Sequence, residues 1–158
     1  MLTWPSRQGW QECLFIAVTA TGLIGTIAYA TSLIVWQVEA KGIWQSLLFV
    51  MLVPAFTEEL FFRGVLIPDA GEGPRAQQWF GFGIGLFILW HVIEATTFLK
   101  GATLFLKPEF LICAAILGTA CACMRYRTGS LWPAVLFHGV LVWAWKSFFG
   151  GPSLAELM

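Results

Sequence analysis

The chain has 158 residues, of which 58% are hydrophobic and 11% are charged, and its formal net charge at pH 7 is zero. About a quarter of the residues in a soluble domain are charged, so this composition favours a membrane protein. No excess of basic residues indicates a nucleic-acid surface, and no acidic block indicates a solvated tail. We therefore expect an integral membrane protein that contacts the lipid bilayer and binds no nucleic acid.

The first apolar stretch covers residues 13–36 and contains no charged side chain. As a helix it would extend about 36 Å, enough to cross a hydrocarbon core about 30 Å thick. A signal peptide is the alternative, because Arg7 precedes the run and Ala28-Tyr29-Ala30 has a small-x-small cleavage pattern. The run continues past that site, so we expect an uncleaved span.

Four further apolar stretches follow along the chain. The first of them contains Pro54, which predicts a kink four residues before an acidic pair. A connector rich in glycine, proline and charge follows over residues 68–75. The sequence predicts an all-α, polytopic bundle of about five spanning helices, forming a single domain over residues 1–158. The four later spans are expected over residues 43–67, 79–99, 109–126 and 131–149.

Several ionisable side chains lie inside these predicted spans. A charged group at bilayer depth costs about 2.5 to 3.5 kcal/mol on insertion scales, so such groups persist where they pair, line a wet cavity or do chemistry. We therefore expect them to converge on one polar site inside the bundle. They are Glu58, Glu59 and Arg63 in the second span, His91 and Glu94 in the third, and His138 in the fifth.

Helical geometry predicts different partners for the two adjacent glutamates. Residues four apart share a helix face, whereas neighbours point about 100° apart. Glu59 can therefore pair with Arg63, which leaves Glu58 turned toward another helix. On the third span, Glu94 lies three residues after His91 and is expected to orient its imidazole from a supporting position.

Glu58, His91 and His138 together form a set that can activate water. In one mechanism the glutamate accepts a proton from water while the histidines hold the water or stabilise an oxyanion. In the other, the same three side chains bind zinc as a two-histidine, one-glutamate site with an open position. Both mechanisms remain open on the residues alone.

The ordered motifs resemble those of the CPBP family, the CAAX-protease and bacteriocin-processing group of intramembrane endopeptidases. The resemblance rests on Glu58-Glu59-x-x-x-Arg63, on Phe87-x-x-x-His91, and on His138 with its approach over residues 127–134. It covers about residues 50–142, most of the chain after the first span.

This resemblance implies an intramembrane endopeptidase of the glutamic type, with metal dependence still open. Glu58 would activate water, His91 and His138 would line the catalytic cavity, and Glu59, Arg63 and Phe87 would order the site. The substrate would be a membrane protein or a tail-anchored peptide. The length of 158 residues is most similar to small bacterial enzymes that process C-terminal sorting anchors, which implies a multi-pass protein of the bacterial inner membrane.

One position departs from the family pattern. The residue four after His138 is usually asparagine, but here it is Val142, which cannot donate a hydrogen bond. A catalytically inactive immunity or scaffolding module of the same fold is therefore the alternative. An ion-coupled carrier is a third hypothesis, disfavoured because no inverted repeat is detectable. Substitute donors in the expected site are Thr57, Trp90, Thr96 and Thr97.

Overall fold

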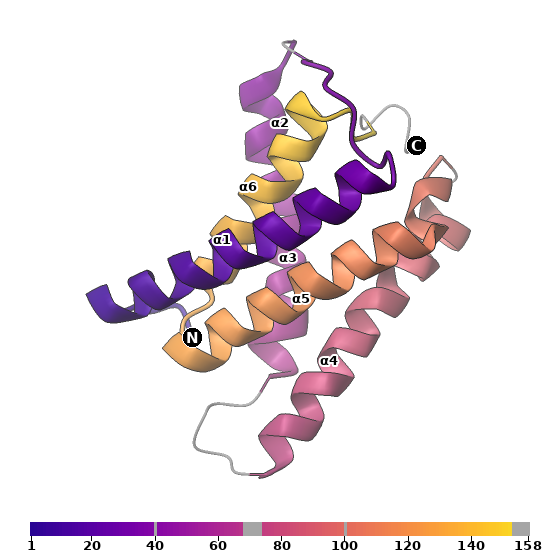
Figure 1. The fold of residues 1–158 in the computed structure, drawn as a ribbon. Coiled ribbons are helices and arrows are strands. Elements are labelled where there is room, and N and C mark those ends of the chain that lie inside the picture. Colours follow the sequence, from indigo (N-terminus) through magenta and orange to yellow (C-terminus); the bar gives the residue numbers. More distant parts are fainter. Residues whose placement is uncertain (40, 68–73, 100, 153–158) are drawn as a thin grey trace.

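The structure is a computed structural model that describes residues 1–39, 41–67, 74–99 and 101–152, with backbone only for residues 74–77. Among these residues it is all-helical, with five long helical rods and no β-strand (Figure 1). The predicted all-α bundle is therefore confirmed. Most of the predicted connector over residues 68–75 lies outside the described residues.

The five rods follow one another in the predicted order. Their elements are α1 (Arg7–Ala30), then α2 (Ile43–Val50), η1 (Met51–Phe56), α3 (Thr57–Glu59) and η2 (Leu60–Val65) as one continuous rod, then α4 (Pro74–Ile93) with η3 (Glu94–Phe98), then α5 (Pro108–Thr128) and α6 (Trp132–Phe148), with the short 3-10 turn η4 (Thr103–Leu106) before α5.

Four of these rods are long and apolar enough to cross a membrane, which indicates a multi-pass integral membrane protein. They are Arg7–Ala30, Ile43–Val65, Gln78–Phe98 and Pro108–Thr128. The remaining helix, α6, has 17 residues. It is therefore about 26 Å long, slightly shorter than a hydrocarbon core of about 30 Å.

The first helix covers Arg7–Ala30 instead of the predicted residues 13–36. Polar residues that were expected to lie before the helix form its first turns instead. The Ser6 hydroxyl caps this end by accepting a backbone N–H at 3.1 Å. Glu12 pairs with Arg127 of α5 at 2.9 Å, which holds a charged turn against the bundle.

The other end of α1 stops early because the chain turns to the C-terminal end of α6. Ser32 has a φ of 57°, a left-handed conformation that ends the helix. The last carbonyls of a helix lack partners within it, and lipid offers none. Here the segment after α1 supplies the missing donors. The N–H groups of Val35, Gln37 and Glu39 donate to the carbonyls of Phe149, Phe148 and Ser147 at 3.3, 3.0 and 2.8 Å.

The predicted irregularity at Pro54 takes the form of a π-helical segment, η1. Proline has no N–H to donate, and its ring collides with the carbonyl four residues earlier in a regular α-helix. The wider turn relieves that collision. A second π segment, η2, follows the acidic pair, and such segments occur frequently at functional sites.

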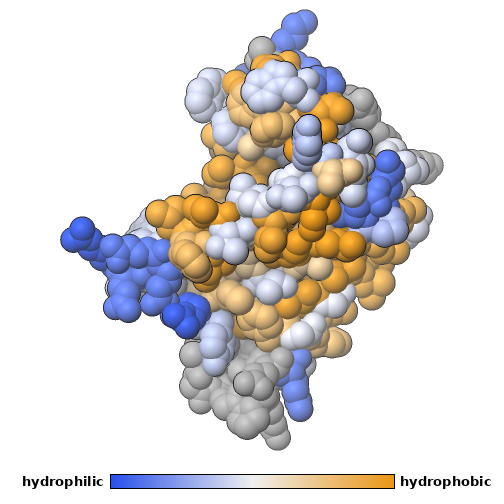
Figure 2. Space-filling view, viewed as in Figure 1, coloured by the Kyte–Doolittle hydropathy of each residue, from blue (hydrophilic) through white to orange (hydrophobic). Residues whose placement is uncertain are grey.

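Helix α5 lies at the centre of the bundle, in contact with α1, α4 and α6 (Figure 1). Half of its most apolar window is buried, against 17–22% for the other three candidate spans. Apolar residues cover the middle of the face in Figure 2, and hydrophilic side chains lie toward its margins. This distribution matches a protein surrounded by lipid at mid-height.

Gly118 of α5 lets this central helix approach the second and third rods closely. A Cβ at this position would lie 2.9 Å from Arg63 Nη2 and 2.9 Å from the Phe87 ring. Real Cβ atoms do not approach so closely, so any larger residue would displace one of these two side chains.

We therefore expect Gly118→Ala to destabilise the protein by about 1–3 kcal/mol, the usual range for overpacking. Thermal unfolding in detergent, followed by circular dichroism, measures the effect. Gly85→Ala is the matched control, because a Cβ at Gly85 meets no atom within 4 Å. Equal unfolding midpoints for the two variants would contradict the close packing at Gly118.

Candidate functional site

Two carboxylates occupy adjacent positions near the middle of the second rod. Glu58 and Glu59 belong to α3, the short α-helical segment between the two π-helical segments. Glu59 is fully buried, whereas the Glu58 side chain is 12% exposed and lines a cavity. The two side chains therefore have different surroundings, as helical geometry predicted.

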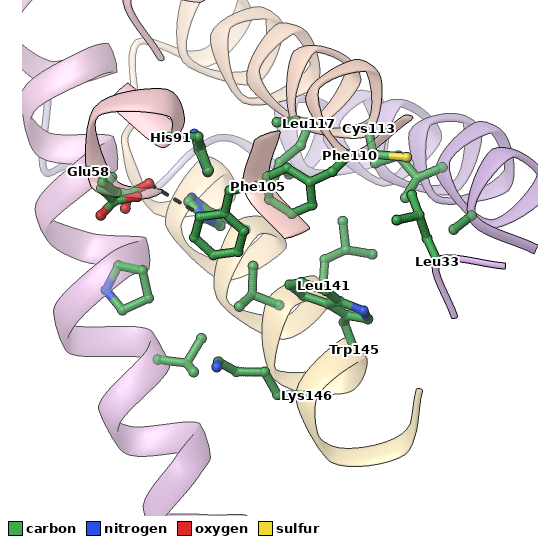
Figure 3. Close-up of a pocket in the computed structure, with 18 of the residues that line it drawn as sticks. Leu33, Glu58, His91, Phe105, Phe110, Cys113, Leu117, Leu141, Trp145 and Lys146 are labelled. Carbon is green, nitrogen blue, oxygen red and sulfur yellow. Dashed lines mark ion pairs between the residues drawn. The ribbon is translucent and has the colours of Figure 1, made fainter. Parts of the chain in front are cut away.

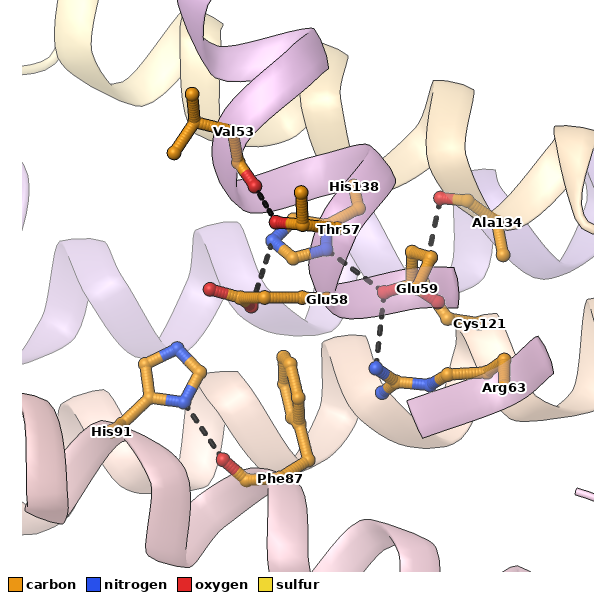
Figure 4. A network of polar contacts seen from close by, with 10 residues as sticks. All are labelled: Val53, Thr57, Glu58, Glu59, Arg63, Phe87, His91, Cys121, Ala134 and His138. Carbon is orange, nitrogen blue, oxygen red and sulfur yellow. Dashed lines mark hydrogen bonds and ion pairs between the residues drawn. The ribbon is translucent and has the colours of Figure 1, made fainter. Parts of the chain in front are cut away.

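Glu59 links its own rod to α6 through a single oxygen. Its Oε1 accepts a hydrogen bond from Arg63 Nη1 at 3.0 Å, which confirms the predicted pair four residues apart. The same oxygen lies 2.8 Å from His138 Nδ1 (Figure 4). All three side chains are buried. The carboxylate is thus held by a guanidinium from its own rod and an imidazole from α6.

This arrangement also assigns the tautomer of His138. A carboxylate paired with arginine can only accept hydrogen bonds, so the Nδ1 of His138 must carry the proton. In the neutral ring, Nε2 is then an acceptor, and it lies 4.0 Å from Glu58 Oε2. This distance is too long for a hydrogen bond. His138 therefore stands between the two glutamates, bonded to one and close to the other.

Phe87 of α4 packs against three of the polar side chains. Its buried ring lies 4.1 Å from the Arg63 guanidinium carbon, in cation–π geometry. Its centroid is 4.7 Å from that of His91 and 6.0 Å from that of His138, edge to face in both cases. One aromatic ring therefore limits the movement of the arginine and of both histidines.

The sequence led us to expect that Glu94 orients His91. In the structure a backbone carbonyl orients the imidazole instead. Its Nδ1 lies 2.9 Å from the carbonyl oxygen of Phe87, one turn earlier. Helical side chains lean toward the N-terminus, so the imidazole meets the preceding turn and not the following one. Figure 4 shows the other ring nitrogen turned toward Glu58. The rings of Phe105 and Phe110 pack against His91 at centroid distances of 5.7 and 5.6 Å.

The three predicted catalytic side chains line one cavity of about 340 Å³ (Figure 3). Glu58, His91 and His138 come from the second rod, α4 and α6, and they share the cavity with Glu94. Most of the remaining wall is apolar. Residues brought together in this wall from distant parts of the chain include Leu33, Phe105, Phe110, Leu117, Leu141 and Trp145.

A family model described as Rce1-like type II CAAX prenyl endopeptidase matches residues 39–144, about two thirds of the chain. The chain belongs to this family. The match includes both glutamates of α3 and both histidines, and it ends just before Lys146. No curated protein and no solved structure shows significant similarity to the chain. Membership implies a protease with a protein substrate, and it gives no finer description of the substrate.

Val142, which replaces the asparagine expected from the family pattern, lies on the cavity wall. Three of the four candidate substitute donors are already engaged, because the hydroxyls of Thr57, Thr96 and Thr97 bond to carbonyls of their own helical turns. The fourth, Trp90, has a buried indole Nε1 with no hydrogen bond of normal length among the described residues. Trp90 lies near the Glu58 carboxylate but not on the cavity wall.

The zinc alternative gains no support from the arrangement of ligands. Within the described parts of the chain, no group of three or more histidine, cysteine, aspartate or glutamate side chains is placed to hold a metal ion. His138 directs Nδ1 at Glu59, and His91 directs Nδ1 at a carbonyl. In both rings Nε2 is left for a further partner, whether a water or a metal ion.

The contact between Glu59 and His138 is the main feature that sequence reasoning missed. The two residues are 79 positions apart, and no local spacing relates them. The motif placed Phe87 in the site, but it could not show that the Phe87 ring packs against Arg63 and both histidines. Only the partners within one helix, such as Arg63, could be read from spacing.

Removing the Arg63 charge should leave Glu59 buried without its ion-pair partner. We expect Arg63→Met to lower the free energy of unfolding by about 3–5 kcal/mol, because breaking one side of a buried pair is strongly destabilising. Unfolding in detergent measures the change. The double variant Glu59→Gln/Arg63→Met removes both charges and should recover much of the loss. A double variant no more stable than Arg63→Met would contradict this account of the pair.

Proposed function

We propose that the protein is an intramembrane endopeptidase that hydrolyses a peptide bond of a membrane-associated protein, with water activated by Glu58. The observation that supports this most strongly is that Glu58, His91 and His138 line one cavity from three separate rods. Family membership supports protease activity independently. The proposal makes this a protease of the glutamic type.

Glu58 is the better candidate for the base because Glu59 is committed elsewhere. Glu59 is fully buried and bonded to Arg63 and His138, so its carboxylate cannot reach a water in the cavity without breaking both contacts. Glu58 lines the cavity, whereas Glu59 does not. In the proposed step Glu58 accepts a proton from water as the hydroxide attacks the carbonyl carbon, and then gives that proton to the leaving amine.

The two histidines would position water and substrate. His138 Nε2, the acceptor nitrogen of the neutral ring, can accept a hydrogen bond from the water that Glu58 deprotonates. His91 has its Nδ1 on a carbonyl, so its other nitrogen is the one available to the reaction. In the neutral ring this nitrogen is an acceptor, so it can position the substrate by accepting a hydrogen bond from a substrate N–H.

The substrate we propose is a C-terminal segment of a membrane-anchored protein, in a bacterial inner membrane. The family description refers to CAAX prenyl endopeptidases, which act near the C-terminus of lipid-modified chains. The largely apolar cavity wall suits a hydrophobic peptide or a lipid-modified residue. Sorting anchors at the C-terminus of a membrane protein are a narrower proposal of the same kind.

A catalytically inactive module is the second candidate, and Val142 on the cavity wall is the observation that favours it. If the asparagine expected at this position donates to the oxyanion, its loss costs about 10²–10³ in rate. Restoring the donor separates the candidates. An inactive module remains inactive as Val142→Asn, whereas a slow enzyme becomes faster.

Glu58→Gln should abolish cleavage of a C-terminal peptide substrate while the protein still folds in the membrane. A general base contributes about 10²–10⁴ in rate, and glutamine cannot accept the proton. Mass spectrometry of peptide incubated with purified protein in detergent measures cleavage. Glu109→Gln, in the first turn of α5, is the control for removing a carboxylate outside the cavity. Cleavage by Glu58→Gln at the unmodified rate would refute the proposed base.

Metal dependence is tested by chelation. A glutamic mechanism predicts that prolonged incubation with EDTA leaves the cleavage rate within about twofold, since no metal generates the nucleophile. Complete loss of cleavage that zinc alone restores would overturn the glutamic assignment in favour of the zinc mechanism.

A further inference from the structure

None of the three predicted catalytic side chains offers a hydrogen-bond donor for the oxyanion that peptide hydrolysis generates. Such an oxygen is stabilised by a donor within hydrogen-bond reach. His91 and His138 direct their Nδ1 protons at a carbonyl and a carboxylate, so in the neutral rings both Nε2 atoms are acceptors. The side chain of Val142, at the place of the family asparagine, has no donor. The donor therefore has to come from another side chain of the cavity.

Other side chains with polar atoms also line the described cavity wall. Trp145 and Lys146 are seven and eight residues beyond His138, a rise of about 10–12 Å along α6. Cys113 of α5 is also remote from the catalytic end of the cavity in Figure 3, and a thiol is a weak donor. Glu94 is the polar lining residue that remains.

Glu94 lies at the same level of the bundle as Val142. Glu94 is three residues after His91 on the third rod, and Val142 is four residues after His138 on α6. The two histidines lie at one level, because both rings pack edge to face on Phe87. The third rod and α6 run in the same direction in Figure 1. These steps therefore lead about 4.5 and 6 Å the same way along the two helices.

Packing beyond this level joins the same two elements. Ala95 of η3 and Trp145, three residues after Val142, both pack against the buried pair Ala102 and Phe105. The end of the third rod therefore converges with α6 on one side of the cavity. The turn that contains the carboxyl group and the turn that lacks the asparagine face one space.

The two carboxyl groups of the cavity lie close to each other. Glu58 is near enough to Glu94 for two negative charges to repel, and the Trp90 indole lies near both carboxyl groups. A neutral indole N–H can donate to one carboxylate but cannot compensate two charges. Two carboxylates that share an apolar cavity do not ionise together readily, so one of them keeps a proton.

Glu94 is the one whose surroundings leave its charge uncompensated. Glu58 lies 4.0 Å from His138 Nε2, in the part of the site that also holds the Arg63 guanidinium. Among the described residues no ion pair includes Glu94. Lys146 is engaged at the C-terminal end of α6, where it donates to a backbone carbonyl. The protonated form therefore belongs to Glu94, and a protonated carboxyl group has one O–H to donate.

We propose that the neutral carboxyl group of Glu94 donates a hydrogen bond to the oxyanion of the tetrahedral intermediate, the role that Val142 cannot fill. This inference rests on the proposed endopeptidase function and adds a catalytic residue to it. Glu58 moves the proton of the water to the leaving amine. The O–H bond of Glu94 is not broken, and its hydrogen bond shortens as negative charge develops on the substrate oxygen.

Substitutions of Glu94 distinguish a donor from a carboxylate. Glu94→Met removes the donor at similar side-chain length and should lower kcat about 10²–10³, with KM within about twofold. Glu94→Gln keeps an N–H donor without a charge and should lose no more than about tenfold in kcat. Mass spectrometry of peptide cleaved by purified protein in detergent measures both constants. Glu109→Met, which removes a carboxylate outside the cavity wall, is the matched control.

The asparagine of the family pattern supplies a second test of the same role. Val142→Asn should restore most of the rate that Glu94→Met loses, because it returns a donor to the same space. In the otherwise unmodified protein the gain should be smaller, since a donor is already present there. Equal gains in the two backgrounds would show that the positions act independently, which would overturn the shared role.

Binding of a tetrahedral mimic tests Glu94 without turnover. The probe is the same peptide with a difluoroketone at the cleaved bond, whose hydrate has two hydroxyl oxygens on a tetrahedral carbon. The reference peptide has a methylene group in place of the ketone. Isothermal titration calorimetry in detergent should show that Glu94→Met weakens binding of the mimic about three- to tenfold, the range for one hydrogen bond. Unchanged binding of the reference peptide shows that the cavity is intact.

Two results would overturn the inference: cleavage by Glu94→Met at the rate of Glu109→Met, or a Glu94→Gln protein as slow as Glu94→Met, which would mean that the position needs a negative charge. Cleavage that does not depend on Glu94 removes the inference and keeps the proposed function. If the wild-type protein does not cleave, the mimic decides. Binding that depends on Glu94 then keeps the donor and removes the proposed function, whereas binding indifferent to Glu94, or no binding, removes both.

Discussion

The site is organised around the shared hydrogen-bond acceptor at Glu59. A fully buried carboxylate is stable only when its charge is compensated, and Glu59 Oε1 meets both an arginine at 3.0 Å and a histidine at 2.8 Å. Because Arg63 belongs to the same rod and His138 to α6, this oxygen joins two parts of the chain. Phe87 adds α4 by packing against Arg63 and both histidines. Glu59 and Phe87 together therefore hold groups that belong to three rods.

Of the two adjacent glutamates, Glu58 is the one that lines the cavity. The 100° turn between neighbouring helical residues separates the surroundings of the two glutamates. The protein therefore uses one glutamate to hold His138 and places the other on the cavity wall beside it. One short segment of the chain thus supplies both the supporting carboxylate, Glu59, and the proposed base, Glu58. The π-helical segments on either side show that the backbone is locally irregular at this point.

The sequence predicts the parts of this structure that depend on short-range geometry. Apolar length predicted the five helices, and four-residue spacing predicted the pair of Glu59 with Arg63. The prediction for α1 was wrong at both ends, because Ser6 caps the helix before its first charged residues and a later segment closes the end of α6. His91 Nδ1 meets the carbonyl of Phe87 rather than Glu94, since a spacing of three residues does not include the direction in which helical side chains lean. A supporting role of Glu94 in the cavity stays a prediction. The bond between Glu59 and His138 depends on tertiary packing, and no local pattern contains it.

The central claim is that the two adjacent glutamates have separate roles, and shortening each by one methylene tests it most directly. Glu58→Asp and Glu59→Asp are compared for turnover of a C-terminal peptide and for thermal unfolding in the same detergent. We expect Glu58→Asp to unfold like the wild type and to lose most of its turnover. Glu59→Asp should lower the unfolding midpoint by several degrees, because its oxygen no longer reaches both Arg63 and His138. A stable Glu59→Asp together with a fully active Glu58→Asp would contradict the assignment.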